Sequence, residues 1–315
     1  MQSLTQTMEA RPDVTIRHVL STTRLWTTIK KHCKITLFSL PVLVPLITFW
    51  VFPTIETAHL STTDWDYIMP TYNYVGIDNY YYILQNPDFL RALSVTTVFT
   101  VCSLVFSMSI GLLLAVAIHK NRFLNRVLKF MYFSPWVTPM AAVSIVWVFM
   151  FDKQGVINMV GDLFGFARVN WLGSSATALI PIIVVTIWTS LGWNMIFYLG
   201  ALSKIPKHIY EAAEIDGVSA ISRLHRIVLP LVSPTTLFLS VINLINFIQA
   251  YTQVDIMTKG GPAGSTQTLI YLFYKYTFTY FEVGRASAIA MIILVITAAL
   301  SALQFRISKK YVFYS

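Results

Sequence analysis

The sequence predicts an all-α integral membrane protein with six transmembrane helices and with both chain ends in the cytoplasm. Two observations carry the fold class. Only 12% of the 315 residues are charged while 56% are hydrophobic, and the charges leave long uncharged runs between them. A soluble domain carries about 25% charged residues, roughly twice this share. A third observation, the placement of the basic residues, gives the orientation.

Each predicted span is a run without Asp, Glu, Lys or Arg. The runs are 18 to 27 residues long, close to the roughly 20 apolar residues that cross a bilayer as a helix. They lack the alternating polarity of barrel strands, and hydrocarbon offers their backbone no hydrogen-bond partners outside a helix. In chain order the predicted helices cover residues 35–52, 93–118, 130–151, 176–202, 235–254 and 286–305.

Lys and Arg gather on alternate sides of these spans. Of the 23 basic residues, 17 lie in segments 1–34, 119–129, 203–234 and 306–315, and the other three loops share 6. Positively charged loops stay in the cytoplasm, so these four segments are predicted to be cytoplasmic. The net charge of +9 therefore reflects topology, and we expect no nucleic acid as a partner.

The same pattern predicts the organisation of the chain. Residues 1–34 form a cytoplasmic N-terminal extension, and residues 35–91 hold the first helix and an external loop. Residues 92–305 form a core of five helices, and residues 306–315 form a cytoplasmic tail.

Signals of catalysis are absent from the sequence. It contains no zinc-protease H-E-x-x-H, no G-x-S-x-G and no G-x-x-x-x-G-K-[ST] phosphate loop. No ionisable Asp, Glu, Lys, Arg or His lies inside a predicted span, which argues against a proton relay. We expect no catalytic residues, no metal site and no cofactor bound by this chain.

The loop at residues 203–234 carries the most information. Pro206 favours a helix that starts at the next residue, and Gly217 supplies a left-handed turn that ends it. Ser219 is a suitable N-cap for a second short helix. The loop is therefore predicted to form two short helices at an angle.

A spaced set of residues in this loop resembles a family signature. Glu-Ala-Ala is followed after three residues by Gly, and after nine more by Ile-x-Leu-Pro. This spacing resembles the EAA loop of bacterial ABC importer permeases. Residues 75–80 and 260–271 likewise resemble segments of the sugar-type members, the maltose and glycerol-3-phosphate systems. The matching positions in the loop are Glu211, Ala212, Ala213, Gly217, Ile227, Leu229 and Pro230.

The resemblance implies a type I ABC importer permease fold in a bacterial cytoplasmic membrane. It implies a second, different permease subunit, two ATPase subunits that hold ATP and Mg²⁺, and an extracytoplasmic binding protein that delivers a carbohydrate. In such permeases the loop acts as a coupling helix, and its Glu meets a basic residue of the ATPase. Glu211 would make that contact here.

Polar and aromatic positions on two spans are expected to face the solute. Their three- and four-residue spacing places each set on one helix face, and the resemblance places them where the maltose permease contacts its sugar. An alternative interpretation is that buried Asn and Ser pair helices with one another. The expected contacts are Thr186, Ser190 and Trp193 on one helix and Asn243, Asn246, Phe247 and Ala250 on the next.

The solute itself stays open at this point. A neutral mono- or oligosaccharide is favoured because the spans contain no basic residue, but glycerol-3-phosphate or a phosphodiester is an alternative. A stand-alone membrane facilitator or an integral membrane enzyme is the remote alternative, in which the loop matches the EAA pattern by chance.

Overall fold

The computed structural model of the chain describes residues 36, 38–119 and 122–312, and of residues 122–126 and 311 it describes the backbone alone. The predicted extension 1–34 therefore lies outside the described residues. Within them every regular element is helical, and the single pairing of extended backbone is a bridge between Thr63 and Tyr74. The chain divides into two compact units, one up to Glu56 and one from Thr57 onward.

The first predicted span is a helix that covers Phe38–Leu60. It contains a wide π-helical turn, η1 (Ile47–Val51), directly before α2 (Phe52–Leu60). Pro53 explains the wide turn, because a proline ring clashes with the carbonyl four residues before it and has no N–H to donate. A π-turn relieves that conflict without ending the helix.

Three further predicted spans are single helices in the second unit. They are α4 (Pro87–His119), α8 (Leu179–Leu202) and α15 (Val283–Tyr311), and with Phe38–Leu60 they are long and apolar enough to cross a membrane. The predicted runs 93–118, 176–202 and 286–305 lie almost wholly inside them.

The other two predicted spans are broken. Run 130–151 is divided between α5 (Arg122–Val137) and α6 (Met140–Met150), bent by 99° at Thr138 and Pro139. Pro135 inside α5 and Pro139 at the break remove two backbone donors, and the residue before a proline is biased away from helical geometry. The prediction of one continuous helix over this run is wrong for that reason.

Run 235–254 ends early. Helix α12 covers Ser233–Ile248, and a separate short helix α13 (Thr252–Met257) follows. The segment Ala220–Leu231 and α12 form a second bent pair, with an angle of 72°. In the described residues the number of candidate spans is four, or six if each bent pair is one span. The prediction of an all-helical membrane protein is confirmed, and the number six holds on that second count.

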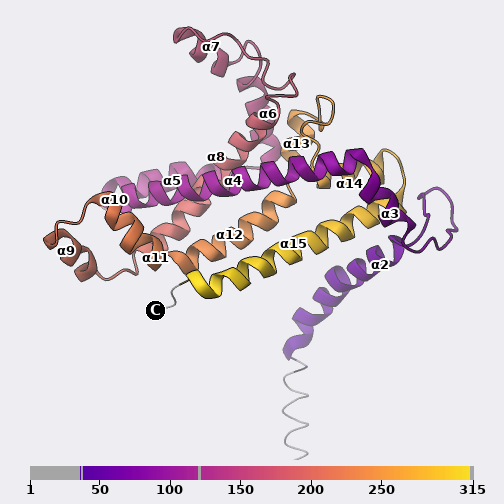
Figure 1. The fold of residues 1–315 in the computed structure, drawn as a ribbon, viewed down its shortest axis with the longest axis horizontal. Coiled ribbons are helices and arrows are strands. Elements are labelled where there is room, and N and C mark those ends of the chain that lie inside the picture. Colours follow the sequence, from indigo (N-terminus) through magenta and orange to yellow (C-terminus); the bar gives the residue numbers. More distant parts are fainter. Residues whose placement is uncertain (1–35, 37, 120–121, 313–315) are drawn as a thin grey trace, which may run out of the picture. The chain divides into compact units, whose positions relative to one another are not determined.

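The core of the second unit is built around α4 and α8, which lie side by side (Figure 1). Helices α5 and α12 pack on α8, and α14 (Leu269–Phe278) packs on α15. Two glycines permit the close approach. A Cβ at Gly111 of α4 would lie 2.7 Å from the Cβ of Asn194, and one at Gly192 of α8 would lie 2.0 Å from the carbonyl oxygen of Tyr132.

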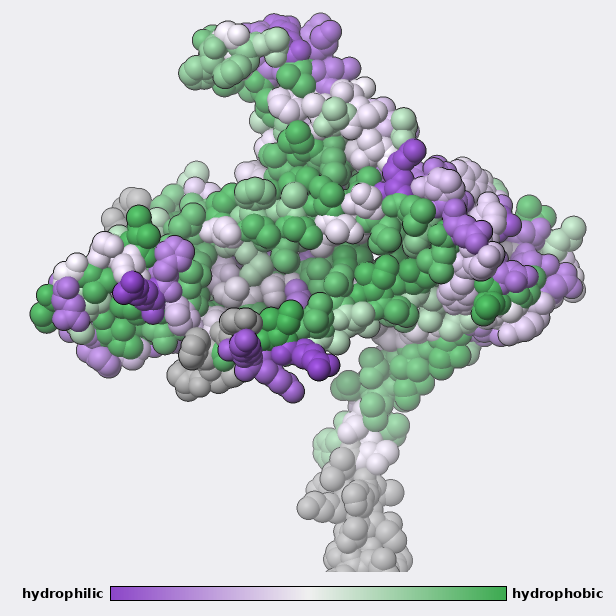
Figure 2. All heavy atoms as spheres, viewed as in Figure 1, coloured by the Kyte–Doolittle hydropathy of each residue, from purple (hydrophilic) through white to green (hydrophobic). Residues whose placement is uncertain are grey.

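In the view of Figure 2, hydrophobic residues cover the middle of the second unit, whereas hydrophilic residues gather towards its two ends and on the segment that projects after α6. One end carries the short helices α9 to α11 and the other carries α3 (Asp78–Gln85). Such a band of apolar surface between polar ends is what a bilayer requires of a bundle that crosses it.

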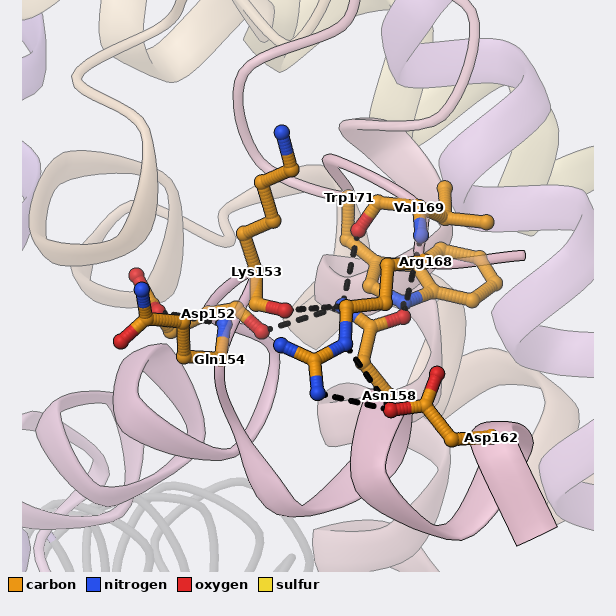
Figure 3. A network of polar contacts seen from close by, with 8 residues as sticks. All are labelled: Asp152, Lys153, Gln154, Asn158, Asp162, Arg168, Val169 and Trp171. Carbon is orange, nitrogen blue, oxygen red and sulfur yellow. Dashed lines mark hydrogen bonds and ion pairs between the residues drawn. The ribbon is translucent and has the colours of Figure 1, made fainter. Parts of the chain in front are cut away.

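The segment that follows α6, here called the α7 arm (residues 152–171), is tied together by one buried amide (Figure 3). The Asn158 Nδ2 group of α7 (Val156–Leu163) donates to the carbonyl oxygens of Asp152, Lys153 and Val169 at 3.1, 3.2 and 2.9 Å. Its Oδ1 atom accepts from Val169 N at 3.1 Å and from Trp171 Nε1 at 3.2 Å. One side chain therefore joins both flanks of the arm.

Candidate functional site

The loop at residues 203–234 folds as two arms, here called the hairpin. Its first arm is α9 (Lys207–Ile215), which begins directly after Pro206 as predicted. Its second arm runs through α10 (Ala220–Arg223), the π-helical η2 (Leu224–Val228) and α11 (Leu229–Leu231).

Both predicted signals of the hairpin turn are confirmed. Gly217 has a φ of +66°, a left-handed conformation that favours glycine. Ser219 caps the second arm, because its Oγ accepts from Ser222 N at 3.3 Å. The wide η2 turn precedes Pro230, where the missing N–H again explains it.

Some of the predicted coupling residues lie on the surface of the hairpin, and others lie where the hairpin meets α12. Glu211 and Ala212 are exposed on α9, whereas Ala213 is buried. Of the two alanines, only Ala212 is therefore accessible on the surface of α9. Ile227, Leu229 and Pro230 are half-buried where the second arm meets α12.

The hairpin also exposes two large apolar residues that were not predicted as coupling residues. Ile215 is 86% exposed and Ile221 is 73% exposed, one on each side of the turn. The available signal for Ile215 was its position directly before the turn at Asp216-Gly217.

A second candidate site is a cavity of about 330 Å³ where the broken spans meet. It lies between the α5–α6 bend, the first half of α8 and the end of α12. The residues that line it are Pro135, Trp136, Thr138, Met140, Thr186, Thr189, Ser190, Asn246, Phe247, Gln249, Ala250, Tyr251, Thr252 and Gln253.

Five of the seven predicted solute contacts line this cavity: Thr186, Ser190, Asn246, Phe247 and Ala250. Trp136, Gln249, Tyr251 and Gln253 were not predicted. These residues were missed because both breaks, at 135–139 and at the end of α12, were predicted as uninterrupted helix. The prolines in 135–139 were the available signal for the first break.

Some hydrogen-bonding groups of the cavity are already bonded within the protein, whereas others are exposed. The Thr186 Oγ1 and Ser190 Oγ groups donate within α8, to Ile182 O and Thr186 O, both at 2.8 Å. Their oxygens keep lone pairs that can accept. The Gln253 Nε2 group donates to Thr186 Oγ1 at 3.3 Å, and the Asn246 amide is exposed. Among the described lining residues no Asp, Glu, Lys, Arg or His occurs.

The structure places the other two predicted contacts, Asn243 and Trp193, off the cavity. Asn243 of α12 is fully buried, and its Nδ2 donates to Asn194 Oδ1 of α8 at 2.8 Å. It therefore pairs helices, as the alternative interpretation held. Trp193 lies behind the cavity wall, with its ring stacked on Trp136 at 4.9 Å between centroids.

Metal-binding geometry is absent from the described part of the chain. No group of three or more His, Cys, Asp or Glu side chains there is arranged to hold an ion.

The comparisons with known proteins agree with this geometry. The profile of the family described as "Binding-protein-dependent transport system inner membrane component" matches residues 107–312. The chain is 32% identical to the sn-glycerol-3-phosphate transport system permease protein UgpA of Agrobacterium fabrum, over 87% of this chain and 94% of the relative. It is 30% identical to the probable ABC transporter permease protein YurN of Bacillus subtilis, over 87% and 95%.

Solved structures show the same fold. A bacterial alginate ABC transporter in complex with alginate pentasaccharide-bound periplasmic protein contains a chain that superposes with a TM-score of 0.78. That chain is 23% identical, and the match covers 91% of this chain and 98% of the other. The MetNI methionine ABC transporter matches more distantly, with a TM-score of 0.53 and 17% identity over 71% and 96%.

Proposed function

Because this chain belongs to the family of binding-protein-dependent transport system inner membrane components, and is thus a multi-pass permease of an ABC importer, we propose that it forms half of a carbohydrate pathway. A second, different permease forms the other half. Two ATPase subunits bind ATP and Mg²⁺, so this chain itself needs no cofactor, and an extracytoplasmic protein delivers the solute. The complex lies in the bacterial cytoplasmic membrane, with the hairpin and both chain ends in the cytoplasm.

The observation that carries this proposal is the hairpin. Its first arm presents the exposed carboxylate of Glu211 beside the small side chain of Ala212, and Ile215 projects at the tip. A charge-assisted hydrogen bond is worth about 1.5–3 kcal/mol, and an apolar anchor adds contact area. Such a surface fits a groove on an ATPase that offers a basic residue.

The cavity supports a neutral carbohydrate. Its hydroxyl oxygens accept while its exposed amides can donate as well, a combination that suits sugar hydroxyls. Aromatic walls from Trp136 and Tyr251 suit the apolar faces of sugar rings. A phosphate would need cationic or backbone N–H partners, and the described lining offers no cationic side chain.

Glycerol-3-phosphate is the second candidate because the printed names of several relatives state it. UgpA proteins of Agrobacterium fabrum and Pectobacterium atrosepticum are 32% and 29% identical to this chain. Their solute would require positive potential from the second permease or from backbone groups at the cavity.

The test is ATP hydrolysis by the complete complex in vesicles. With the binding protein present, neutral mono- and oligosaccharides and sn-glycerol-3-phosphate are compared as stimulants. We expect a neutral saccharide to stimulate hydrolysis and Asn246→Leu to reduce its uptake. Stimulation by sn-glycerol-3-phosphate alone would replace the carbohydrate with the second candidate.

A further inference from the structure

The turn of the hairpin is not held by packing. In the described residues, no heavy atom outside its chain neighbours lies within 4 Å of the place where a Cβ of Gly217 would stand. Val218 N donates to Ala213 O at 3.0 Å and Gly217 N donates to Glu214 O at 3.2 Å. These bonds end α9, but they do not reach the second arm. Both arms also pack side chains on the hydrophobic cluster formed with α4 and α8. A direct contact between the arms would act together with this packing in setting their angle.

One side chain crosses from the second arm to the first. The Arg223 Nη1 atom of α10 lies 3.2 Å from Glu214 Oε1 of α9. The Arg223 side chain is only 19% exposed, against 61% for Glu214. Burial raises the pKa of Tyr210, and the nearby charge of Arg223 opposes that rise. The guanidinium thus pairs with Glu214, and Tyr210 lines the same cavity as both of them.

Beneath this crossing lies a cavity of about 300 Å³ between the hairpin and the bundle. The ends of α4 and α8 contribute Val116, His119 and Leu202, and both arms contribute the rest. The centroid of the Tyr210 ring lies 6.3 Å from that of the ring of His119, the last residue of α4. The hairpin therefore packs on the bundle around a cavity, with apolar side chains of both arms in the core cluster.

We propose that Arg223 and Glu214 are positioning residues whose ion pair fixes the angle between the two arms of the hairpin. With that angle fixed, a displacement of α9 passes through Tyr210 and His119 to α4. Without it, α9 pivots at Gly217 into the cavity, and the displacement does not reach α4. This inference rests on the proposed contact between the hairpin and the ATPase.

An ordinary exposed ion pair contributes little to stability, about 0–1 kcal/mol, so stability does not test the proposal. The angle does. Spin labels at positions 208 and 225 place one exposed site on each arm, in a background from which Cys33 and Cys102 are removed. The distance distribution between the labels is measured in the complete complex, with Arg223→Gln, Glu214→Gln and the exchange Glu214→Arg with Arg223→Glu. Arg226→Gln removes a positive charge from an exposed position one turn along the same arm and is the matched control.

We expect a narrow distribution in the native chain, in the control and in the exchanged pair, and a broad one in both single variants. Stimulation of MgATP hydrolysis by the binding protein should fall about fivefold in the single variants, which corresponds to about 1 kcal/mol of lost coupling, and return in the exchanged pair.

A narrow distribution in both single variants would overturn the proposal. So would an exchanged pair that behaves like the single variants, because Glu214 would then act on the ATPase rather than on Arg223. Glu214→Gln keeps the test open if Arg223→Gln does not accumulate, since the Glu214 side chain is mostly exposed. If the ATPase does not co-purify with the native chain, the proposed function is contradicted. If the ATPase binds every variant and the distance between the labels is unchanged, only this inference is contradicted.

Discussion

The α7 arm and the hairpin are both short helical segments that leave the bundle, yet they are held in opposite ways. In the α7 arm a buried Asn158 makes five hydrogen bonds to backbone and side-chain groups on both flanks. In the hairpin, one ion pair between Arg223 and Glu214 crosses an open glycine turn above a cavity.

The difference indicates different mechanical roles. A buried amide with all its groups satisfied fixes one geometry, because each lost bond leaves a polar group unpaired away from water. A segment with few buried contacts opens at low cost. The α7 arm is thus built as a fixed platform, and the hairpin as a segment that can move against the bundle while the ion pair keeps its two arms together.

The largest expected effect is at the platform. Asn158→Leu leaves the partner groups of the amide unsatisfied, and we expect the arm to be destabilised by about 3–5 kcal/mol. Hydrogen exchange of residues 152–171 should accelerate while that of the hairpin stays unchanged. Gln154→Leu, at an exposed position of the same arm, is the control. Native protection in Asn158→Leu would remove the contrast between the two regions.

The next effect is at the hairpin turn. Gly217→Val places a β-branched residue at a φ of +66°, with an expected local cost of about 1–2 kcal/mol. The space around Gly217 is open, so the cost is conformational and the protein should accumulate normally while uptake falls. Gly217→Asn, which tolerates left-handed geometry, should keep most uptake. Equal loss in both variants would show that the turn conformation is not what matters.

A smaller effect separates a fixed amide from an accessible one inside the bundle. Asn243→Leu removes the bond to Asn194 and should lower the stability of the complex by about 0.6–1.7 kcal/mol. Asn246→Leu changes an exposed cavity amide and should reduce uptake at unchanged stability. Thermal unfolding of the purified complex, measured beside uptake, distinguishes the two; a shared phenotype would contradict the placement of the cavity.

The smallest effect is expected at the Arg–carboxylate pair of the α7 arm. Arg168 and Asp162 lie 2.8 Å apart on the α7 arm, with side chains 44% and 37% exposed. Because solvent screens such a pair and Asn158 already holds the arm, Arg168→Gln should change stability and coupling by less than about 0.5 kcal/mol. A loss of coupling as large as that of Arg223→Gln would show that ion pairs matter equally in both regions.

The sequence predicted the fold well where local signals agree. Charge-free runs located α4, α8 and α15, and Gly217 and Ser219 located the hairpin turn. The prediction failed where a proline lies inside an apolar run, because a hydropathy pattern does not indicate the 99° bend at Pro139. The cavity depends on that bend and on the early end of α12, so Trp136 and Gln253 could not be assigned to it. The Asn158 network and the Arg223–Glu214 pair join residues whose neighbourhood no periodicity reveals.

The central claim is that the hairpin transmits movement between the bundle and an ATPase, and Glu211→Lys tests it most directly. The exposed carboxylate of Glu211 can change sign without disturbing the fold, since exposed substitutions usually change stability by less than about 0.5 kcal/mol. The measurement is solute uptake and binding-protein-stimulated ATP hydrolysis by the complete complex, beside the amount of chain in the membrane. We predict a normal amount of chain with loss of both activities. Full uptake and full stimulation in Glu211→Lys would contradict the claim.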